Sequence, residues 1–282
     1  MMDKLFVAGI VLYNPDIEKL KENIRAIYKQ VPQVILVDNG SSNVSMIRQL
    51  DGTFPNVSIE FLSENFGIAY AQNKICQYAN EKGYKWAITL DQDSVCPQNL
   101  VSEYSNYVND DKVGMLCSRI YDINCGYVDV ISNEDATTEV KDCLASASAI
   151  RISAWKNIGG FFEPMFIDKV DFEISYNLRA HDYKILRVNK VILKHEIGHS
   201  VVRHFLFKDR RVFNHNYIRV YYMVRNTFVM IRRYGMERRW LSGLLVGFWS
   251  ILFYEHNRKR KLRFFLKGLI DGFNGKLGRL QL

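Results

Sequence analysis

The feature that most limits the fold of this chain is a regular alternation of two hydrophobic periodicities over its first hundred residues. Short apolar runs of strand length are separated by segments that have the spacing of an amphipathic helix. The apolar runs lie at 7–12, 34–37, 57–62 and 86–90, and the helical segments lie at 16–29, 44–50 and 66–82. This order predicts an α/β fold, with a mostly parallel sheet, right-handed crossovers and flanking helices.

Polar or turn-forming residues follow each of the four predicted strands. They are Tyr13-Asn14-Pro15, Asp38-Asn39-Gly40-Ser41-Ser42, Glu64-Asn65-Phe66-Gly67 and Asp91-Gln92-Asp93. The carboxyl ends of parallel strands lie at one edge of a sheet, and open α/β sheets bind their ligands there. Any one of these segments is also typical of an ordinary turn. Their recurrence at four strand ends favours a common ligand site.

The triplet Asp91-Gln92-Asp93 places two carboxylates at this edge. Mg²⁺ and Mn²⁺ prefer oxygen ligands and commonly connect one or two carboxylates to substrate phosphates. The chain contains neither G-x-G-x-x-G after its first strand nor G-x-x-x-x-G-K-S/T anywhere, so a metal ion is the expected counter-charge for phosphate. Although such triplets are common in loops, this one follows a buried strand and indicates an enzyme that uses a nucleotide-diphosphate donor.

The stretch Lys194-His195-Glu196-Ile197-Gly198-His199 contains the letters H-E-x-x-H of a zinc-protease helix. A glycine inside a helix costs about 1 kcal/mol, and β-branched residues flank this stretch. The longer pattern H-E-x-x-H-x-x-G-x-x-H fails because Val202 and Phe205 stand where its glycine and third histidine belong. The sequence therefore favours a strand that ends in a loop over a metalloprotease helix.

A helix and a hairpin are predicted between residues 170 and 193. Residues 170–180 have helical spacing, and the runs 185–188 and 191–193 predict a hairpin around Asn189-Lys190. Asp168, Asp171 and Glu173 cluster near the start of the helix. Repulsion among them is expected to raise the pKa of at least one carboxyl, which suits a general base near neutral pH. The alternative is a group of solvated acids that favour the helix dipole.

Charge is divided unevenly along the chain. From Arg203 to the end there are 18 lysines and arginines against 4 acids, a net +14, which leaves −6 for residues 1–202. Within this basic part, 240–254 is an apolar, aromatic-rich stretch of about 22 Å as a helix, too short for a hydrocarbon core of about 30 Å. Cations on both sides of it suit a helix lying in the headgroup region of an anionic membrane. An ordinary helical core with a basic face is the alternative, and nucleic-acid binding is disfavoured because no recognition motif accompanies the charge.

Cysteine usage and the N-terminus bear on the compartment. The five cysteines are scattered and never spaced C-x-x-C, which favours buried free thiols in a reducing cytoplasm; they are Cys76, Cys96, Cys117, Cys125 and Cys143. The N-terminus runs directly into a strand-like segment, and no secretory signal is evident. We therefore expect a cytoplasmic protein, peripheral on the inner face of the cell membrane, with a body over 1–202 and a basic helical tail over 203–282.

Five segments taken together resemble the successive motifs of family 2 glycosyltransferases with the GT-A fold. They are Tyr13-Asn14-Pro15, Val37-Asp38-Asn39-Gly40-Ser41-Ser42, Asn65-Phe66-Gly67-Ile68-Ala69-Tyr70-Ala71-Gln72-Asn73, Leu90-Asp91-Gln92-Asp93 and Phe166-Ile167-Asp168-Lys169-Val170-Asp171-Phe172-Glu173. The resemblance extends from about Val7 to the stretch 221–226. Within the family the chain is similar to bacterial rhamnosyltransferases, which transfer rhamnose from dTDP-L-rhamnose onto growing polysaccharide or lipid-linked glycans.

The resemblance implies a role for residues at each strand end. Asp38, beside Asn39, would recognise the pyrimidine ring of the donor, with Tyr13 and Pro15 next to it. The pocket under the nucleotide sugar and its phosphates would be formed by Asn65, Gly67 and Asn73. The metal ion would be held by Asp93 and His195, and less directly by Asp91. Arg225 would be an additional cation for the diphosphate.

The resemblance also implies the chemistry. Asp171 would be the general base that takes the proton of the acceptor hydroxyl in a single inverting displacement, supported by Asp168 and Glu173. Two departures from the family pattern are Val170, where many relatives have Glu, and Asn177, where an Arg is frequent.

The expected protein is thus an inverting glycosyltransferase that uses Mg²⁺ or Mn²⁺. Its partners would be a dTDP- or UDP-linked sugar donor, a glycan or lipid-linked acceptor and an anionic membrane surface, with no nucleic acid. UDP-galactofuranose or UDP-glucose is an alternative donor for the same scaffold, and a catalytically silent membrane-bound scaffold is the alternative of another class.

Overall fold

The computed structural model describes residues 4–124, 126–128, 135–195, 201–205, 208–212 and 214–281, of which 195, 201–205 and 208–212 are described as backbone only. The chain divides into two compact units. One, here called the sheet unit, comprises Met1–Glu163 and Val170–His195. The other, here called the helical unit, comprises Pro164–Lys169 and Glu196–Leu282.

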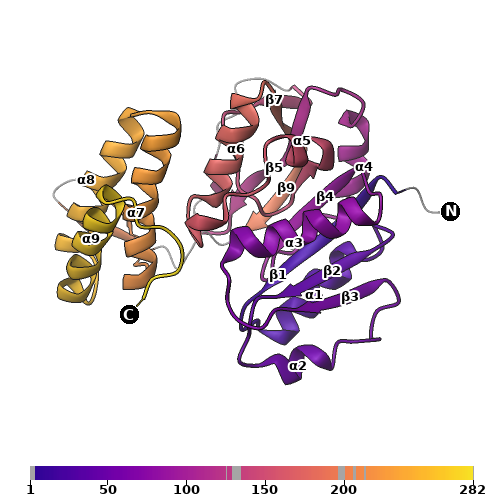
Figure 1. Cartoon of the computed structure of the whole chain (residues 1–282), viewed down its shortest axis with the longest axis horizontal. Coiled ribbons are helices and arrows are strands. Elements are labelled where there is room, and N and C mark those ends of the chain that lie inside the picture. The colour runs from indigo at the N-terminus through magenta and orange to yellow at the C-terminus, as the bar shows by residue number, and fades with distance from the viewer. Residues whose placement is uncertain are drawn as a thin grey trace. The chain divides into compact units, whose positions relative to one another are not determined.

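The sheet unit is built on a nine-stranded sheet with the order β3-β2-β1-β4-β8-β5-β9-β7, with β6 paired to β5 (Figure 1). The strands β3, β2, β1 and β4 are parallel to one another, whereas β8 runs antiparallel to β4 and β5. The strands are β1 (Phe6–Leu12), β2 (Val34–Asp38), β3 (Val57–Phe61), β4 (Trp86–Asp91), β5 (Val113–Asp122), β6 (Gly126–Tyr127), β7 (Thr137–Glu139), β8 (Ser148–Arg151) and β9 (Lys184–His195).

Helices and short 3-10 turns connect these strands. The α-helices are α1 (Ile17–Ile27), α2 (Val44–Arg48), α3 (Ile68–Glu81), α4 (Leu100–Tyr104), α5 (Ile152–Asn157) and α6 (Val170–Ala180), and the 3-10 turns are η1 (Ser105–Tyr107) and η2 (Glu163–Met165). The strands β1, β2 and β4 are apolar almost without interruption because helices cover both faces of a parallel sheet. Helix α3 packs so closely on β1 that a Cβ at Gly9 would lie 2.4 Å from the Ile75 side chain.

The first hundred residues confirm the predicted order of strands and helices, and the segment 170–180 is the helix α6. The predicted hairpin is wrong, because Lys184–His195 is one continuous strand. The pairing of β9 with β5 shifts register after Val188 and resumes at Ile192. Asn189 lies in this bulge and donates to Asp135 O and Thr138 Oγ1 instead of turning the chain.

The helical unit contains α7 (Tyr217–Tyr234), α8 (Arg238–Phe253) and α9 (Arg258–Phe273), together with an antiparallel pair, β10 (Val201–Phe205) and β11 (Lys208–Val212). Its core lies between the three helices and is formed by Val220, Val224, Ile251 and Phe265. Helices α7 and α9 approach closely at Gly268, where a Cβ would lie 2.7 Å from Tyr221 O. In the described part of the chain, no helix has both the length and the apolar character needed to cross a bilayer.

Candidate active site

The turns that follow β1, β2 and β4 are joined by side-chain hydrogen bonds. Tyr13 N donates to Gln92 Oε1 at 2.8 Å, and Gln92 Nε2 donates back to Tyr13 O. Asn14 N donates to Ser41 Oγ, and Asn14 Oδ1 accepts from both N and Oγ of Ser42 at 2.7 Å. The three turns therefore meet at the carboxyl edge of the sheet, as their positions in the sequence predict.

The turn after β3 joins the same network. Asn39 Nδ2 donates to Asn65 Oδ1 at 3.2 Å, and Asn39 Oδ1 accepts from Phe66 N at 2.9 Å. Asn65 Oδ1 also accepts from Gly67 N, the residue before α3. Gly67 has a φ of 93°, a conformation open chiefly to glycine. All four predicted strand-end segments thus converge. The hydrogen bonds of Asn39 and Asn65 and the conformation of Gly67 hold the turns after β2 and β3 together.

Asp38 lies at the bottom of this edge with only 1% of its surface exposed. One carboxylate oxygen accepts from Ser41 Oγ at 2.5 Å and from Ser41 N at 3.3 Å. The tight turn between them needs Gly40, which has a φ of 75° and whose Cβ would lie 2.5 Å from the Glu64 carbonyl carbon. A carboxylate fixed in this way is an acceptor that can bind an N–H of a ring.

Tyr13 and Pro15 lie on the same edge with opposite exposure. The Tyr13 side chain is 49% exposed, whereas Pro15 is buried and its carbonyl accepts from Asn43 Nδ2. Tyr13 thus offers an aromatic surface to a ligand, and Pro15 fixes the backbone beside it.

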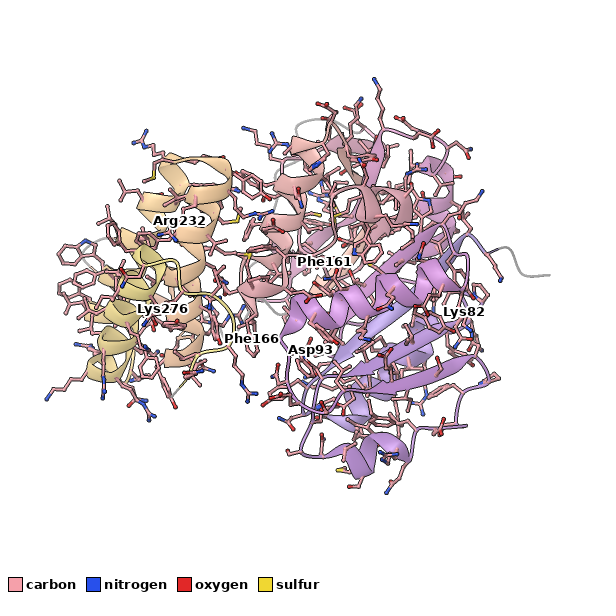
Figure 2. All side chains as sticks on the ribbon, in the orientation of Figure 1. Lys82, Asp93, Phe161, Phe166, Arg232 and Lys276 are labelled. Atoms are coloured by element: carbon pink, nitrogen blue, oxygen red, sulfur yellow. The ribbon has the colours of Figure 1, made fainter. Side chains whose placement is uncertain are left out.

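The two carboxylates after β4 differ in their surroundings. Asp91 is partly buried, and its backbone is held by Asn23 Nδ2 and Ser146 Oγ. Asp93 is exposed beyond it, in the position labelled in Figure 2. The part of the chain that the structure describes holds no group of three or more metal-ligating side chains. Two carboxylates nevertheless fit a divalent ion whose other ligands are substrate phosphates and water.

Asn73 has a different place from the predicted one. Its Nδ2 donates to Phe161 O and Glu163 Oε1, and its Oδ1 accepts from Phe161 N and Trp155 Nε1 at 2.8–2.9 Å. Both ends of the amide are therefore bonded to protein groups. Asn73 ties α3 to the segment before η2, so it shapes the sheet unit instead of contacting a phosphate.

The first turn of α6 carries the two acids of the predicted cluster that belong to the sheet unit. Asp171 is partly exposed, and its Oδ1 accepts from Phe172 N at 3.1 Å. Glu173 is fully buried, with 0% of its surface exposed. Glu173 can support the packing of α6 but cannot touch an acceptor. Asn177, in place of the arginine frequent in the family, donates to Ile158 O inside the unit.

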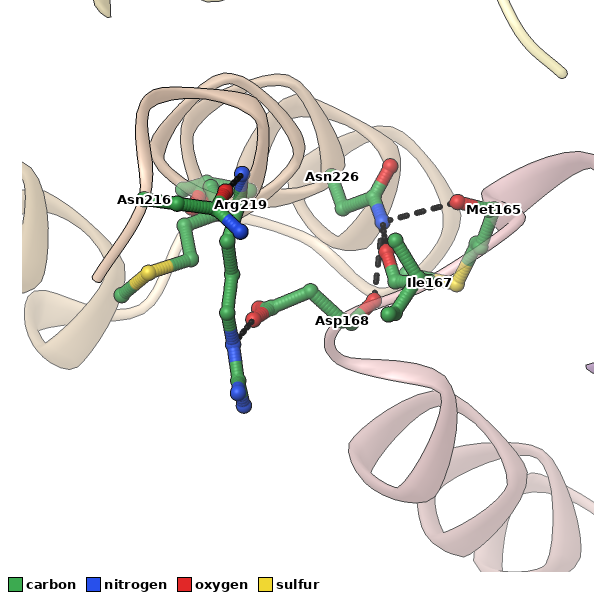
Figure 3. Close-up of polar contacts among 8 residues, drawn as sticks. Met165, Ile167, Asp168, Asn216, Arg219 and Asn226 are labelled. Atoms are coloured by element: carbon green, nitrogen blue, oxygen red, sulfur yellow. Dashed lines mark hydrogen bonds and ion pairs between the residues drawn. The ribbon is translucent and has the colours of Figure 1, made fainter. Parts of the chain in front are cut away.

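The segment Pro164–Lys169 of the helical unit has an unusual backbone. Phe166, Asp168 and Lys169 all have positive φ, at 65°, 71° and 58°. The left-handed conformation costs a non-glycine residue about 1–2 kcal/mol, so three such residues persist only where neighbours hold them. The side chain of Asn226 does this by donating to Met165 O, Ile167 O and Asp168 O, as Figure 3 shows.

The Asp168 carboxylate faces α7. It pairs with Arg219 Nε at 3.4 Å, and its side chain is 11% exposed while that of Arg219 is 50% exposed (Figure 3). The pair leaves the guanidinium on the surface, where Arg219 can turn toward a ligand.

The predicted contact of Arg225 with a diphosphate does not agree with its position. Arg225 is 1% exposed and donates to Gly278 O, Pro164 O, Met165 O and Asn226 Oδ1. Burial lowers its pKa, and the neighbouring Tyr221 and Tyr222 oppose this shift. Its hydrogen-bonding groups are occupied by protein oxygens, so Arg225 is a structural residue of the helical unit.

The remaining predicted ligand, His195, ends β9, and its side chain lies outside the described residues, as do Glu196, Ile197, Gly198, His199 and Ser200. Residues 184–195 are in the strand β9, as expected up to His195. The metal-ligand role of His195 stays a prediction.

Sequence reasoning missed several residues that build the site. Asn14, Ser41 and Gln92 connect the strand ends, and Asn226 holds the segment before α6. The first three belong to segments that the sequence had marked as polar strand ends. Nothing in the local pattern around Asn226 indicates its partners, which lie about 60 residues earlier.

The parallel core, the polar carboxyl edge and the D-x-D turn define the class of GT-A nucleotide-sugar transferases. The sequence profile of "Glycosyl transferase family 2" matches residues 8–169, and the chain belongs to this family. The chain is 26% identical, over 98% of its own length and 98% of the relative, to "dTDP-rhamnosyl transferase RfbF" of Shigella flexneri.

Solved structures share the fold. S. aureus TarS 1-349 in complex with UDP-GlcNAc matches with a TM-score of 0.61 at 13% identity, covering 96% of this chain and 81% of that one. GalNAc-T7 with UDP, GalNAc and Mn²⁺ matches with a TM-score of 0.59 at 16% identity, covering 68% of this chain. The match spans 44% of the GalNAc-T7 chain.

Proposed function

We propose that this protein transfers L-rhamnose from dTDP-L-rhamnose to a hydroxyl group of a growing polysaccharide or lipid-linked glycan. The observation that carries the proposal is the convergence of four strand-end turns around the buried Asp38 and the exposed Asp93. End-to-end similarity to a dTDP-rhamnosyl transferase supports the sugar and the nucleotide.

The nucleotide end of the donor is assigned to the floor of the site. A thymine or uracil ring carries one N–H between two carbonyls, and the fixed carboxylate of Asp38 is a matching acceptor. Tyr13 offers its exposed ring to the base beside it. Because Ser41 holds this carboxylate in one place, we expect the contact to favour the ring N–H of thymine or uracil.

The diphosphate is assigned to the region of Asp93, with Asp91 behind it and His195 as a further ligand. A bound Mg²⁺ or Mn²⁺ would neutralise the charge that develops on the leaving diphosphate. The carboxylates of this chain would hold and orient that ion together with the donor phosphates.

The transfer step is assigned to Asp171. Its carboxylate accepts the proton of the acceptor hydroxyl while that oxygen forms a bond to the anomeric carbon. The bond from the anomeric carbon to the diphosphate oxygen breaks, and dTDP leaves from the opposite side. One displacement of this kind inverts the configuration. Asp168, held by Arg219, is the acid that supports the acceptor side.

The donor assignment predicts an order of binding. With Mn²⁺ present, dTDP-L-rhamnose and dTDP should bind more tightly than UDP-galactofuranose, UDP-glucose and UDP, and GDP or ADP should bind at least about tenfold more weakly than either pyrimidine, the equivalent of about 1.4 kcal/mol. Calorimetric titration of the full chain measures this order. Tighter binding of a UDP-sugar would move the donor assignment to UDP, and equal binding of purine nucleotides would contradict the role of Asp38.

We also propose that the helical unit binds an anionic membrane surface. Helix α8 has no charged residue after Arg239 and is apolar on two faces. Leu244, Phe248 and Ile251 pack into the helical core. A second face exposes a row at a spacing of four, which consists of Leu241, Leu245, Trp249 and Phe253. An exposed apolar face of this length, with two aromatic rings, suits the boundary between headgroups and acyl chains.

Helix α9 adds cations beside apolar side chains. A groove of about 650 Å³ along it is lined by Lys259, Leu262, Arg263, Leu266, Lys267, Ile270, Asp271 and Lys276. Lys267 and Lys276 are paired with Asp271. Within the described residues, neither Lys259 nor Arg263 forms an ion pair, so their charges remain available for lipid phosphates. The exposed side chains of Leu266 and Ile270 continue the apolar surface.

Reversing two of these charges is the test of membrane binding. Lys261 is unsuitable, because it is buried in an ion pair with Glu255 at 2.7 Å. Each cation near an anionic surface contributes about 1 kcal/mol, so Lys259→Glu with Arg263→Glu should weaken binding to phosphatidylserine vesicles at least about 30-fold. Flotation or sedimentation at low salt measures it. The matched control reverses two exposed cations of the sheet unit, Lys29 and Lys82; equal losses in both variants, or no loss in either, would refute the proposed surface.

A further inference from the structure

We infer that the helical unit has a second task, and that Asn226 is a positioning residue for the transfer step. In this inference Asn226 fixes the backbone of Pro164–Lys169, and that backbone sets the path along which the chain enters α6 and reaches Asp171. The inference rests on the proposed function for the role of Asp171, but its structural part can be tested without activity.

The contacts of Asn226 concentrate on one short segment. Its side chain is fully buried, and its Nδ2 donates to Met165 O at 3.1 Å, to Ile167 O at 2.8 Å and to Asp168 O at 2.8 Å (Figure 3). Three carbonyls within four residues point at one amide nitrogen. Such an arrangement requires a curled backbone, and it agrees with the positive φ of Phe166, Asp168 and Lys169.

A neighbouring residue fixes which way the Asn226 amide points. Arg225 Nε and Nη2 both donate to Asn226 Oδ1, at 2.9 and 2.7 Å. With its oxygen facing a guanidinium, the amide can present only its NH₂ group to the segment. Arg225 Nη2 also donates to Met165 O and Pro164 O. The pair Arg225-Asn226 therefore acts as one clamp on the segment.

Two further contacts from the helical unit hold the segment Pro164–Lys169. Gly278 N donates to Pro164 O at 2.7 Å, which joins the C-terminal stretch to the segment. The Phe166 ring stacks on Tyr222 with 5.3 Å between centroids. Helix α7 and the C-terminal stretch therefore both contribute contacts that hold Pro164–Lys169 in its conformation.

The position of this segment in the chain indicates why it is held. Lys169 is followed directly by Val170, which begins α6, and then by Asp171. Three non-glycine residues in the left-handed region relax to commoner conformations when nothing holds them, and clusters of such residues mark functional sites. Relaxation would change the direction of the chain at the start of α6, and a small displacement of a base has a large effect on rate.

The first experiment separates positioning from stability. Asn226→Ala should lower kcat for transfer at least tenfold while the donor KM stays within twofold, because the donor contacts lie elsewhere. Thr227→Val is the matched control: it removes the hydrogen bond from Oγ1 of the buried Thr227 to Met223 O, one position further along the same helix, but leaves the clamp intact. It should keep kcat within twofold. A folded Asn226→Ala enzyme with unchanged kcat, or one whose loss is entirely in KM, would overturn the inference.

A second substitution tests the backbone mechanism itself. Glycine adopts positive φ without the steric penalty, so Lys169→Gly should restore part of the kcat lost in Asn226→Ala. Absence of any recovery would contradict the mechanism. If Asn226→Ala does not fold, Asn226→Ser retains one donor and takes its place, with a smaller expected loss of at least threefold.

Hydrogen exchange gives the readout that needs no substrate. Amides of the peptide covering 164–171 should exchange at least tenfold faster in the Asn226 variant than in Thr227→Val, and the peptides of β1 and β4 should not change. Equal exchange in the two variants would refute the clamp. If the two variants differ in exchange in this way but the wild-type chain transfers no sugar, the proposed function alone is refuted.

Discussion

Replacing Asp171 by asparagine is expected to reduce sugar transfer by a factor of about 10²–10⁴ while leaving donor binding unchanged. The substitution preserves size and can still accept from Phe172 N, but it removes the group that takes the acceptor proton. The loss should therefore be in kcat. Steady-state transfer and donor titration on the same preparation measure the two quantities separately.

Asp182→Asn is the matched control for this prediction, because Asp182 is exposed just beyond the end of the same helix. It should have no effect beyond twofold. An Asp171→Asn enzyme that transfers at close to the wild-type rate would exclude Asp171 as the base, and the partly buried carboxyl of Asp168 would be the next candidate.

Asp93→Asn should have the second largest effect, at least about a 10²-fold loss of transfer at a fixed low Mn²⁺ concentration. Removing a charged ligand weakens the binding of the metal ion, so raising the Mn²⁺ concentration should recover part of the activity. A titration of transfer rate against Mn²⁺ checks this. Asp51→Asn, at an exposed carboxylate in the turn after α2, should leave the Mn²⁺ dependence unchanged. Identical Mn²⁺ curves for Asp93→Asn and the wild type would remove Asp93 from the metal site.

The same titration tests His195, the first histidine of the H-E-x-x-H stretch. His195→Ala should weaken the Mn²⁺ dependence in the same direction as Asp93→Asn, whereas Glu196→Gln should change it little. A larger effect of Glu196→Gln than of His195→Ala would favour a metalloprotease, in which Glu196 is the general base.

The sheet and its ligand edge could be predicted because both depend on local patterns. Runs such as 34–37 are apolar throughout because both faces of a parallel strand are covered, and a polar turn follows each one. Asp38 and Asp93 were identified from their position after such runs. The topology then brings these turns together, since parallel strands end at one edge.

The parts that could not be predicted depend on partners far apart in the chain. Arg225 was expected to be an additional cation for the diphosphate, and only the folded chain shows its bonds to Pro164, Met165 and Gly278. The Asn189-Lys190 pair has the composition of a hairpin turn, but pairing with β5 and the bond from Asn189 to Asp135 O maintain a bulged strand. In each case tertiary contacts override the local preference.

Nucleotide release from sugar donors is the measurement that tests the account most directly. The purified chain is incubated with dTDP-L-rhamnose, glycan and lipid acceptors and Mn²⁺, with and without a chelator, and peptide hydrolysis is followed in the same samples. We predict Mn²⁺-dependent release of dTDP together with an inverted rhamnosyl product, both lost in Asp171→Asn, and no peptide hydrolysis. Two results would contradict sugar transfer as the function. One is that a folded, metal-loaded chain releases no nucleotide from any of the dTDP- and UDP-sugars tried. The other is peptidase activity that disappears in Glu196→Gln.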